Sequence, residues 1–273
     1  MCSMGTHRRR VRPDPAAGPA CPTCGHQGRR RDPTPGDRPW LAGTGALPDL
    51  APQRFTLDRD RTALVLIDLQ YVDASRSRGW GPMLVRDHPA TAEYYFGRVE
   101  RIVVPNAVRL LTSFRSEGLR VIHVTLGPVL KDGSDLAPPR RGDPDSALET
   151  LASWVGSEDH SILDVLQPRD GELCVNKTSR SAFSSTALDQ LLRNLGITGL
   201  VVAGVTTGSC VDTTARDAAD RGYLTVIVED ACAELDEPSH LAALRQFVVR
   251  WGRVWSTSEA LAHLGMDAGT QPG

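Results

Sequence analysis

The most informative part of the chain is residues 200–233, which read LVVAGVTTGSCVDTTARDAADRGYLTVIVEDACA. The apolar, β-branched run 200–205 predicts a buried strand, the Gly, Thr and Ser residues at 204–209 predict a tight turn, and 211–221 predicts a helix. Cys210 then lies at the start of that helix, where free amides and the helix dipole favour an anion and lower the pKa of a thiol. A strand, a sharp turn and this cysteine indicate a nucleophile, although a small cysteine also packs well between helix and sheet.

Length and composition limit what this cysteine can belong to. A chain of 273 residues can bury a full core, and 40% hydrophobic with 23% charged residues is typical of a soluble globular protein. The net charge of -2 predicts neither a nucleic-acid nor a membrane partner, and no apolar run approaches the ~20 residues that span a bilayer. Six scattered cysteines form no disulfide framework, and no hydrophobic leader follows the N-terminal arginines, so we expect a reduced, cytoplasmic protein.

The N-terminal segment differs from the rest of the chain. Residues 1–40 contain eight arginines, three acids and seven prolines, a composition that cannot bury enough apolar surface to fold alone. We therefore predict a basic, poorly ordered tail over 1–54, one domain over 55–266 and a flexible end over 267–273. Deleting residues 1–40 should leave folding and activity nearly unchanged. Cys21, Cys24 and His26 could form half of a zinc site, but no second ligand pair follows at the required spacing.

Strands and helices alternate from Phe55 onward. This alternation predicts a three-layer α-β-α sandwich in which a six-stranded, mostly parallel sheet has helices on both faces. The predicted strands are 61–69, 119–126, 172–176, 200–205, 223–229 and 252–255, and the predicted helices are 104–117, 184–195 with Ser184 as N-cap, 211–221, 239–250 and 257–264. Two long irregular segments, 71–96 and 127–168, interrupt the pattern. His123 lies within the second strand among apolar neighbours, which favours a hydrogen-bonded core histidine over a metal ligand.

Three polar residues share one position in this pattern. Asp68, Lys177 and Cys210 each stand at or just after the C-terminal end of a different strand, the edge at which open parallel sheets bind their ligands. Each has an ordinary interpretation alone: a turn former, a surface lysine and a core cysteine. Together they form a nucleophile with a base and a charge partner.

At these residues the chain resembles the isochorismatase-like cysteine hydrolases, in particular the branch of N-carbamoylsarcosine amidase, biuret hydrolase and ureidoacrylate hydrolase. The matching pieces are ALVLIDLQ around Asp68, NKTSRSAF around Lys177 and AGVTTGSCVDTTARDAADRGY around Cys210, within about residues 58–262. The resemblance implies a six-stranded parallel sandwich, an Asp68, Lys177 and Cys210 triad, and a cis peptide between Val205 and Thr206. Nicotinamidase-like members carry a metal site after the second strand, whereas HVTLGPVLKDG lacks its paired histidines, so we expect no metal and no cofactor.

The resemblance and the residue chemistry together predict a mechanism. Asp68 takes the proton of Cys210, Lys177 favours the charged forms, and the thiolate attacks the carbonyl carbon of a small amide, ureido or carbamoyl compound. The amides of Cys210 and Thr206 receive the oxyanion, a thioester forms, and ammonia or an amine leaves. The alternatives are hydrolysis of a vinyl ether, as in isochorismatases, and a non-catalytic scaffold of the same fold.

Further expectations concern the pocket, the other thiols and assembly. Trp80 and Phe183 are predicted as apolar pocket contacts, and Arg76 as the anchor for a substrate carboxylate. Cys174 should point into the sheet and Cys232 should lie past the fifth strand, which leaves Cys210 as the one essential thiol and the first to react with iodoacetamide. We expect a homo-oligomer, a dimer or tetramer, with Tyr94, Tyr95, Phe96 and residues 127–168 at the interface. The alternative is that these three aromatics line the pocket of their own subunit.

Overall fold

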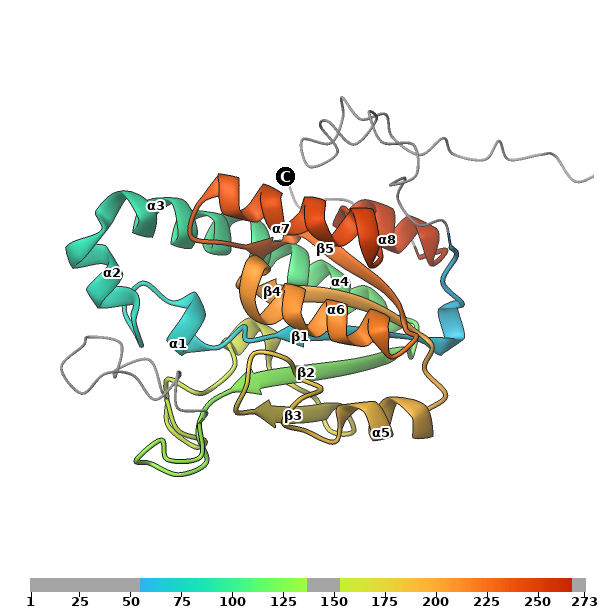
Figure 1. Ribbon diagram of the computed structural model, residues 1–273, viewed down its shortest axis with the longest axis horizontal. Coiled ribbons are helices and arrows are strands. Elements are labelled where there is room, and N and C mark those ends of the chain that lie inside the picture. The colour runs from blue at the N-terminus through green and yellow to red at the C-terminus, as the bar shows by residue number, and fades with distance from the viewer. Residues whose placement is uncertain (1–54, 137–152, 267–273) are drawn as a thin grey trace, which may run out of the picture. The chain divides into compact units, whose positions relative to one another are not determined.

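The computed structural model of the protein describes residues 55–136 and 153–266. Its centre is a six-stranded sheet in the order β3-β2-β1-β4-β5-β6, and every neighbouring pair is parallel (Figure 1). The strands are β1 (Thr62–Ile67), β2 (Arg120–Leu126), β3 (Leu173–Lys177), β4 (Gly199–Val205), β5 (Leu224–Ala233) and β6 (Arg253–Trp255). The predicted six-stranded parallel sheet is confirmed.

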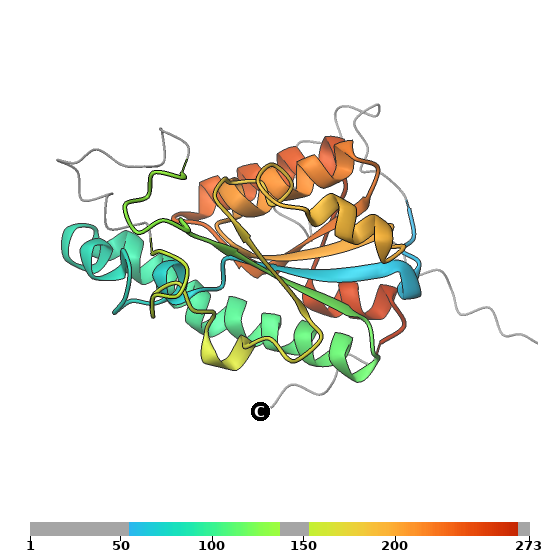
Figure 2. The same ribbon diagram turned by 90° about the horizontal axis from the view of Figure 1, so that it is seen from below.

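Helices cover both faces of this sheet (Figure 2). One face carries α3 (Pro89–Arg98), the π-helical turn η6 (Val99–Val103), α4 (Val104–Ser116) and α8 (Thr257–His263), and the other carries α5 (Leu188–Asn194), α6 (Asp212–Asp220) and α7 (Glu237–Arg250). Side chains of β1 and β4 alternate between the two apolar clusters, so both strands are buried along their whole length. This double coverage explains their continuous apolar sequence, because a strand between two helix layers has no solvent-facing side.

The segment that follows β1 is more regular than its sequence indicates. Residues 71–96, predicted to be a long loop, contain α1 (Tyr71–Ala74), α2 (Gly81–Asp87) and most of α3. Prolines occupy the first turn of α2 and of α3, a position that helices tolerate because the first amides have no intrahelical partner. Tyr95 and Phe96 are fully buried in this single chain, so their side chains are not available for an oligomer interface and pack within their own subunit.

Three further expectations are corrected. Cys174 is exposed, since it lies on the edge strand β3, which is only partly covered. Cys232 lies inside β5, which continues past the predicted end at residue 229, and its side chain is fully buried. The helix predicted from 184 begins at Leu188 with Ala187 as N-cap, because residues 178–187 turn back toward α6, where the amide of Ala182 donates to Thr214 Oγ1 at 3.1 Å.

The remaining helical turns are short. They are η5 (Arg59–Arg61), η9 (Asp164–Leu166) and η10 (Thr207–Val211), the last of which leads directly into α6. Within residues 55–136 and 153–266, no helix has the length and hydropathy to cross a bilayer. Cys21, Cys24 and His26, together with the segments 1–54 and 267–273, lie outside the described residues.

Candidate active site

The three predicted residues meet at the C-terminal edge of the sheet. Asp68 directly follows β1, Lys177 is the last residue of β3, and Cys210 lies in η10 after β4. Asp68 has a φ of 53°, and its amide donates to the carbonyl oxygen of Val124 on β2 at 2.9 Å, so the backbone turns sharply at this point. A positive φ at a residue other than glycine is uncommon and concentrates at functional sites.

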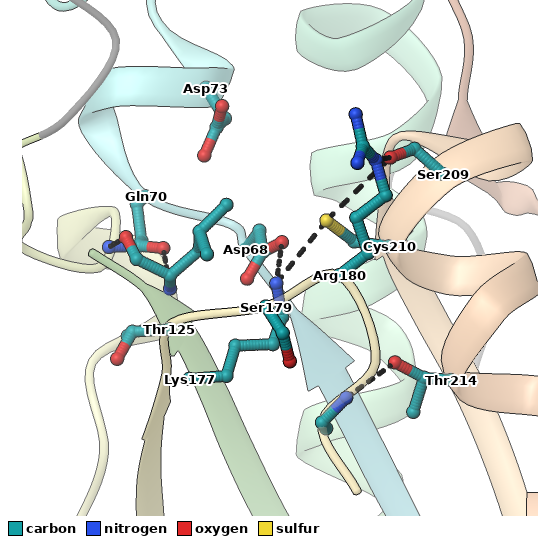
Figure 3. A network of polar contacts seen from close by, with 12 residues as sticks. Asp68, Gln70, Asp73, Thr125, Lys177, Ser179, Arg180, Ser209, Cys210 and Thr214 are labelled. Carbon is teal, nitrogen blue, oxygen red and sulfur yellow. Dashed lines mark hydrogen bonds and ion pairs between the residues drawn. The ribbon is translucent and has the colours of Figure 1, made fainter. Parts of the chain in front are cut away.

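Lys177 joins the other two groups (Figure 3). Its Nζ donates to Asp68 Oδ2 at 2.8 Å and to Cys210 Sγ at 3.2 Å. Because β2 lies between β3 and β1, only a long side chain can cross from Lys177 to Asp68. All three groups are buried, with 0%, 1% and 6% of Lys177, Asp68 and Cys210 exposed. Asp68 Oδ1 is also buried and accepts no hydrogen bond within the described part of the chain, which leaves one carboxylate oxygen available for a proton.

The electrostatics of the site correct one expectation. The pKa of Cys210 is not lowered: burial raises it to about 12, and the negative charge of Asp68 adds to this while Lys177 opposes it. Burial lowers the pKa of Lys177, but its charge interaction with Asp68 and its contacts with Asp68 and Cys210 outweigh burial, so the pKa is raised overall. At neutral pH the resting site therefore holds a thiol and an ammonium ion, and the thiol needs a base before it can attack.

The backbone before the nucleophile has a special geometry. The peptide bond between Val205 and Thr206 is cis, at the position where the family resemblance implied one. Just before it, Gly204 has a φ of 131°, and a Cβ atom there would lie 2.0 Å from the carbonyl oxygen of Ile67. Only glycine permits this approach of β4 to β1, so the turn that carries Cys210 depends on it.

Polar side chains bind to η10, the turn that carries Cys210. Glu234 Oε2 accepts the amide of Gly208 at 2.7 Å, and the hydroxyl of Thr207 lies 2.8 Å from His240 Nδ1. Arg98 reaches the other ring nitrogen of His240 at 3.0 Å. These bonds connect η10 to the residue that follows β5, to α7 and to α3, and they fix the backbone on which Cys210 stands.

Sequence analysis did not single out a set of amide side chains beside the triad. Gln70 is fully buried; its Nε2 donates to the carbonyl oxygens of Leu126 at 3.3 Å and His160 at 2.7 Å, and its Oε1 accepts the amide of Leu126 at 2.7 Å. Asn176 accepts from Thr125 Oγ1 at 3.2 Å, lies 2.9 Å from His160 Nε2, and donates to Gly127. Both residues bind together the strand ends that carry Asp68 and Lys177, and the only signal for them was their place beside those residues in ALVLIDLQ and NKTSRSAF.

The three predicted substrate contacts have different surroundings. Trp80 packs on Tyr95 and Phe96, with ring centroids 5.2 and 5.6 Å away. Phe183 is buried in the same apolar cluster as Cys210. The Arg76 guanidinium pairs with Glu93 at 3.0 Å and Glu100 at 2.7 Å, so two carboxylates of α3 and η6 already neutralise it, and the contacts do not bring it to the triad.

Two charged residues beside the triad were not predicted. Figure 3 shows Asp73 of α1 projecting toward the space above Asp68, and Arg180 lying beside Cys210 and Ser209. Asp73 Oδ1 accepts from Trp80 Nε1 at 3.1 Å, and Arg180 Nε donates to Ser209 Oγ at 3.1 Å. In the sequence both belong to stretches of mixed polar residues with no distinguishing pattern.

Among the described residues, no group of three or more His, Cys, Asp or Glu side chains is arranged to hold a metal ion. His123, the histidine of the second strand, is 1% exposed and lies 2.9 Å from Glu172 Oε2, in agreement with its interpretation as a hydrogen-bonded core histidine.

Comparison with known proteins places this geometry in a family. The model of the isochorismatase domain matches residues 62–259, which include Asp68, Lys177 and Cys210. The chain belongs to the isochorismatase family. Ureidoacrylate amidohydrolase RutB of Acinetobacter baylyi is 29% identical over 204 residues, covering 70% of this chain and 78% of that protein. The isochorismatase family protein YwoC of Bacillus subtilis is 30% identical over 209 residues, covering 76% and 96%.

Solved structures of isochorismatase-family proteins share the same fold. A cysteine hydrolase from Pseudomonas syringae pv. phaseolicola aligns with a TM-score of 0.65 at 26% identity, covering 78% of this chain and 97% of that one. N-carbamoylsarcosine amidase from Thermoplasma acidophilum aligns with a TM-score of 0.53 at 26% identity, covering 72% and 96%. The resemblance seen in three sequence pieces therefore extends over the whole α/β domain.

Proposed function

We propose that this isochorismatase-family protein is a cysteine hydrolase that cleaves a C–N bond of a small amide, ureido or carbamoyl compound through a thioester. The observation that carries the proposal is the buried contact of Lys177 with both Asp68 and Cys210, at 2.8 and 3.2 Å. It places a base, a cation and a thiol within one site. Relatives named for amide hydrolysis, ureidoacrylate amidohydrolase and N-carbamoylsarcosine amidase, support the same reaction class.

The first step is attack by sulfur. The pKa of Cys210, raised to about 12 by burial and by Asp68, keeps the thiol protonated at neutral pH, so attack requires Asp68 to take the proton. Asp68 Oδ1 is the oxygen free to do so, since Oδ2 accepts from Lys177. The sulfur electron pair forms the S–C bond as the carbonyl π pair moves to oxygen. The Lys177 ammonium stabilises the anion that develops on sulfur during the transfer.

Backbone amides stabilise the oxyanion, whereas Asp68 protonates the leaving group. The backbone amides of Cys210 and Thr206 are proposed to donate to the oxyanion, and one such preorganised donor contributes roughly 3 kcal/mol to catalysis. Collapse of this intermediate breaks the C–N bond, and the proton held by Asp68 moves to the leaving nitrogen. Ammonia or an amine departs, and Asp68 then accepts a proton from water. The resulting hydroxide attacks the thioester carbon, the C–S bond breaks, the acid product leaves, and the proton on Asp68 returns to the Cys210 sulfur.

The test is product analysis with matched cysteine variants. A panel of small ureido, carbamoyl and primary amide compounds should release ammonia or amine with the wild-type protein and with Cys174→Ala, which changes an exposed thiol far from the triad cysteine in the sequence. Cys210→Ala and Cys210→Ser should lose at least about a thousandfold in kcat, as expected when a covalent nucleophile is removed. Rapid quenching followed by mass spectrometry should find the acyl group on Cys210.

Each contrary result favours a different alternative. Full turnover by Cys210→Ala would contradict the thioester route. Release of pyruvate from a vinyl ether, without cleavage of any amide, would favour the isochorismatase-type reaction. Absence of turnover across the whole panel would favour a non-catalytic scaffold.

A further inference from the structure

The site carries one negative and one positive side chain that the triad chemistry does not use. Asp73 stands on α1, half-buried, against the aromatic wall formed by Trp80, Tyr95 and Phe96. Trp80 Nε1 donates to its Oδ1 at 3.1 Å, and the Tyr95 hydroxyl donates to its backbone oxygen at 2.9 Å. These two bonds fix the direction of the carboxylate, which projects toward the space above Asp68 (Figure 3).

The positive side chain stands on the other side of the nucleophile. Arg180 lies in the segment that follows Lys177, and Figure 3 shows its guanidinium beside Cys210. Ser209 Oγ accepts from Arg180 Nε at 3.1 Å, which ties the guanidinium group to the residue next to Cys210. Arg180 is exposed, and its two terminal nitrogens have no hydrogen-bond or ion-pair partner among the residues that the structure describes. The edge between these two terminal nitrogens suits a carboxylate, which it can bind in bidentate geometry.

We propose that Asp73 and Arg180 are specificity-determining residues that set the polarity of the substrate. Asp73 accepts hydrogen bonds from N–H groups at the end of the substrate that carries the leaving nitrogen. Arg180 binds an acidic group on the part of the substrate that becomes the acyl group. The substrate class is thus a small acid that ends in a carbamoyl, ureido or primary amide group. This assignment of ends rests on the proposed function, because Asp68, below Asp73 in Figure 3, is the group that delivers a proton to the leaving nitrogen.

Electrostatics supports this orientation over its reverse. An acidic group placed at the Asp73 end would face two carboxylates, Asp68 and Asp73, at short range in a poorly solvated site. The same group at the Arg180 end meets a cation whose N–H edges are available. Neutral N–H groups of the substrate prefer the Asp73 end, because the Asp73 carboxylate accepts hydrogen bonds whereas a guanidinium has no acceptor atom. The negative charge of Asp73 is also felt at Cys210, where it contributes to the raised pKa of the thiol.

A test that needs no substrate uses two alkylating reagents of the same size. Iodoacetate is an anion and iodoacetamide is a neutral N–H donor, and both react by displacement of iodide by the cysteine sulfur. Both reagents react with the same thiolate, so the ratio of the iodoacetate rate to the iodoacetamide rate at one cysteine does not depend on the pKa of that thiol. The ratio reports whether the surroundings of the cysteine favour the negatively charged reagent. Peptide mass spectrometry gives this ratio for Cys210, with the exposed Cys174 as a reference within the same molecule.

The expected ratios follow from the two charges. Iodoacetate should be favoured more at Cys210 than at Cys174. Arg180→Gln should lower the ratio of iodoacetate to iodoacetamide reaction at Cys210 about tenfold, which is the usual effect of losing one charge-assisted hydrogen bond. Arg180→Lys keeps the positive charge and should lower this ratio less. Asp73→Asn, which retains the acceptor for Trp80, should raise the ratio several-fold. Arg193→Gln on α5 and Asp87→Asn on α2 remove the same charges at the surface and should change nothing. A Cys210 ratio that neither Arg180→Gln nor Asp73→Asn alters would overturn the proposal.

Turnover then separates this inference from the proposed reaction. With an acidic amide that the wild-type protein hydrolyses, Arg180→Gln should raise KM about 10- to 100-fold with little change in kcat, while a neutral amide of equal size should be affected less than about threefold. Equal effects on both amides would refute the polarity while leaving the amidase intact. A charge preference in alkylation without amide hydrolysis would instead refute the reaction and retain the two charged residues as ligand contacts.

Discussion

Replacement of Lys177 by methionine should destabilise the protein as well as inactivate it. Methionine keeps most of the stem but removes the ammonium, which leaves the Asp68 carboxylate 1% exposed and without its counter-ion at 2.8 Å. Breaking a buried ion pair from one side costs about 3–5 kcal/mol, because the remaining charge is neither solvated nor paired. For a domain of this size, such a loss should lower Tm by roughly 6–20 °C.

The measurement is a double-mutant cycle in urea at pH 7. The free energy of unfolding is compared for wild type, Lys177→Met, Asp68→Asn and the double variant, with circular dichroism as the signal. If the loss comes from the buried charge, the double variant should be more stable than Lys177→Met alone by about 2 kcal/mol or more, since the Asp68→Asn change replaces the unpaired carboxylate with a neutral amide. All three variants should lack amide hydrolysis.

The reasoning fails under two results. A Lys177→Met loss below about 1 kcal/mol would mean that the carboxylate is solvated or protonated at no cost. A double variant that is less stable than Lys177→Met would show that packing of the lysine stem, rather than charge pairing, dominates the effect.

Four other results are expected. Partial burial raises the pKa of Glu172, but hydrogen bonds from Arg115, Arg169 and His123 outweigh it and lower the pKa to about 2. Its contribution of roughly 3 kcal/mol should be present above pH 4.5 and lost as the pH falls toward 2, so unfolding of Glu172→Gln should be less pH-dependent than wild type there. Gly204→Ala should lose about 3 kcal/mol or more and most activity, because its Cβ would meet the Ile67 carbonyl at 2.0 Å; a soluble variant of wild-type Tm would refute this. Light scattering should give a multiple of 29.5 kDa, and a monomeric active enzyme would exclude the proposed dimer or tetramer. Deleting residues 1–40 should leave Tm and activity nearly unchanged, and loss of folding would show that this segment packs on the domain.

Periodicity in the sequence predicted the order of the main elements well. The continuous apolar runs of β1 and β4 indicated strands covered on both faces, and the structure buries both completely. Because parallel strands end at one edge, that order also implied that Asp68, Lys177 and Cys210 would converge. Strand pattern is a local property of the chain, which is why it could be interpreted without coordinates.

Side-chain environments depended on contacts distant in sequence. The helix-start position of Cys210 predicted a lowered pKa, but its burial and the nearby Asp68, 142 positions earlier, raise the pKa to about 12. Arg76 was selected for its charge, yet Glu93 and Glu100 neutralise it, while the guanidinium of Arg180 lies beside the nucleophile.

The sequence by itself determined the parallel sheet, the convergence of Asp68, Lys177 and Cys210 and the family resemblance, because these follow from residue pattern and strand order. Only the tertiary structure decided which charges face the nucleophile. It brought Asp73 and Arg180 to opposite sides of Cys210, and it buried Tyr95 and Phe96 in helix α3 instead of leaving them for an interface. The physical reason is that burial and electrostatic interaction depend on distance in space, and residues more than a hundred positions apart become neighbours only when the sheet is assembled.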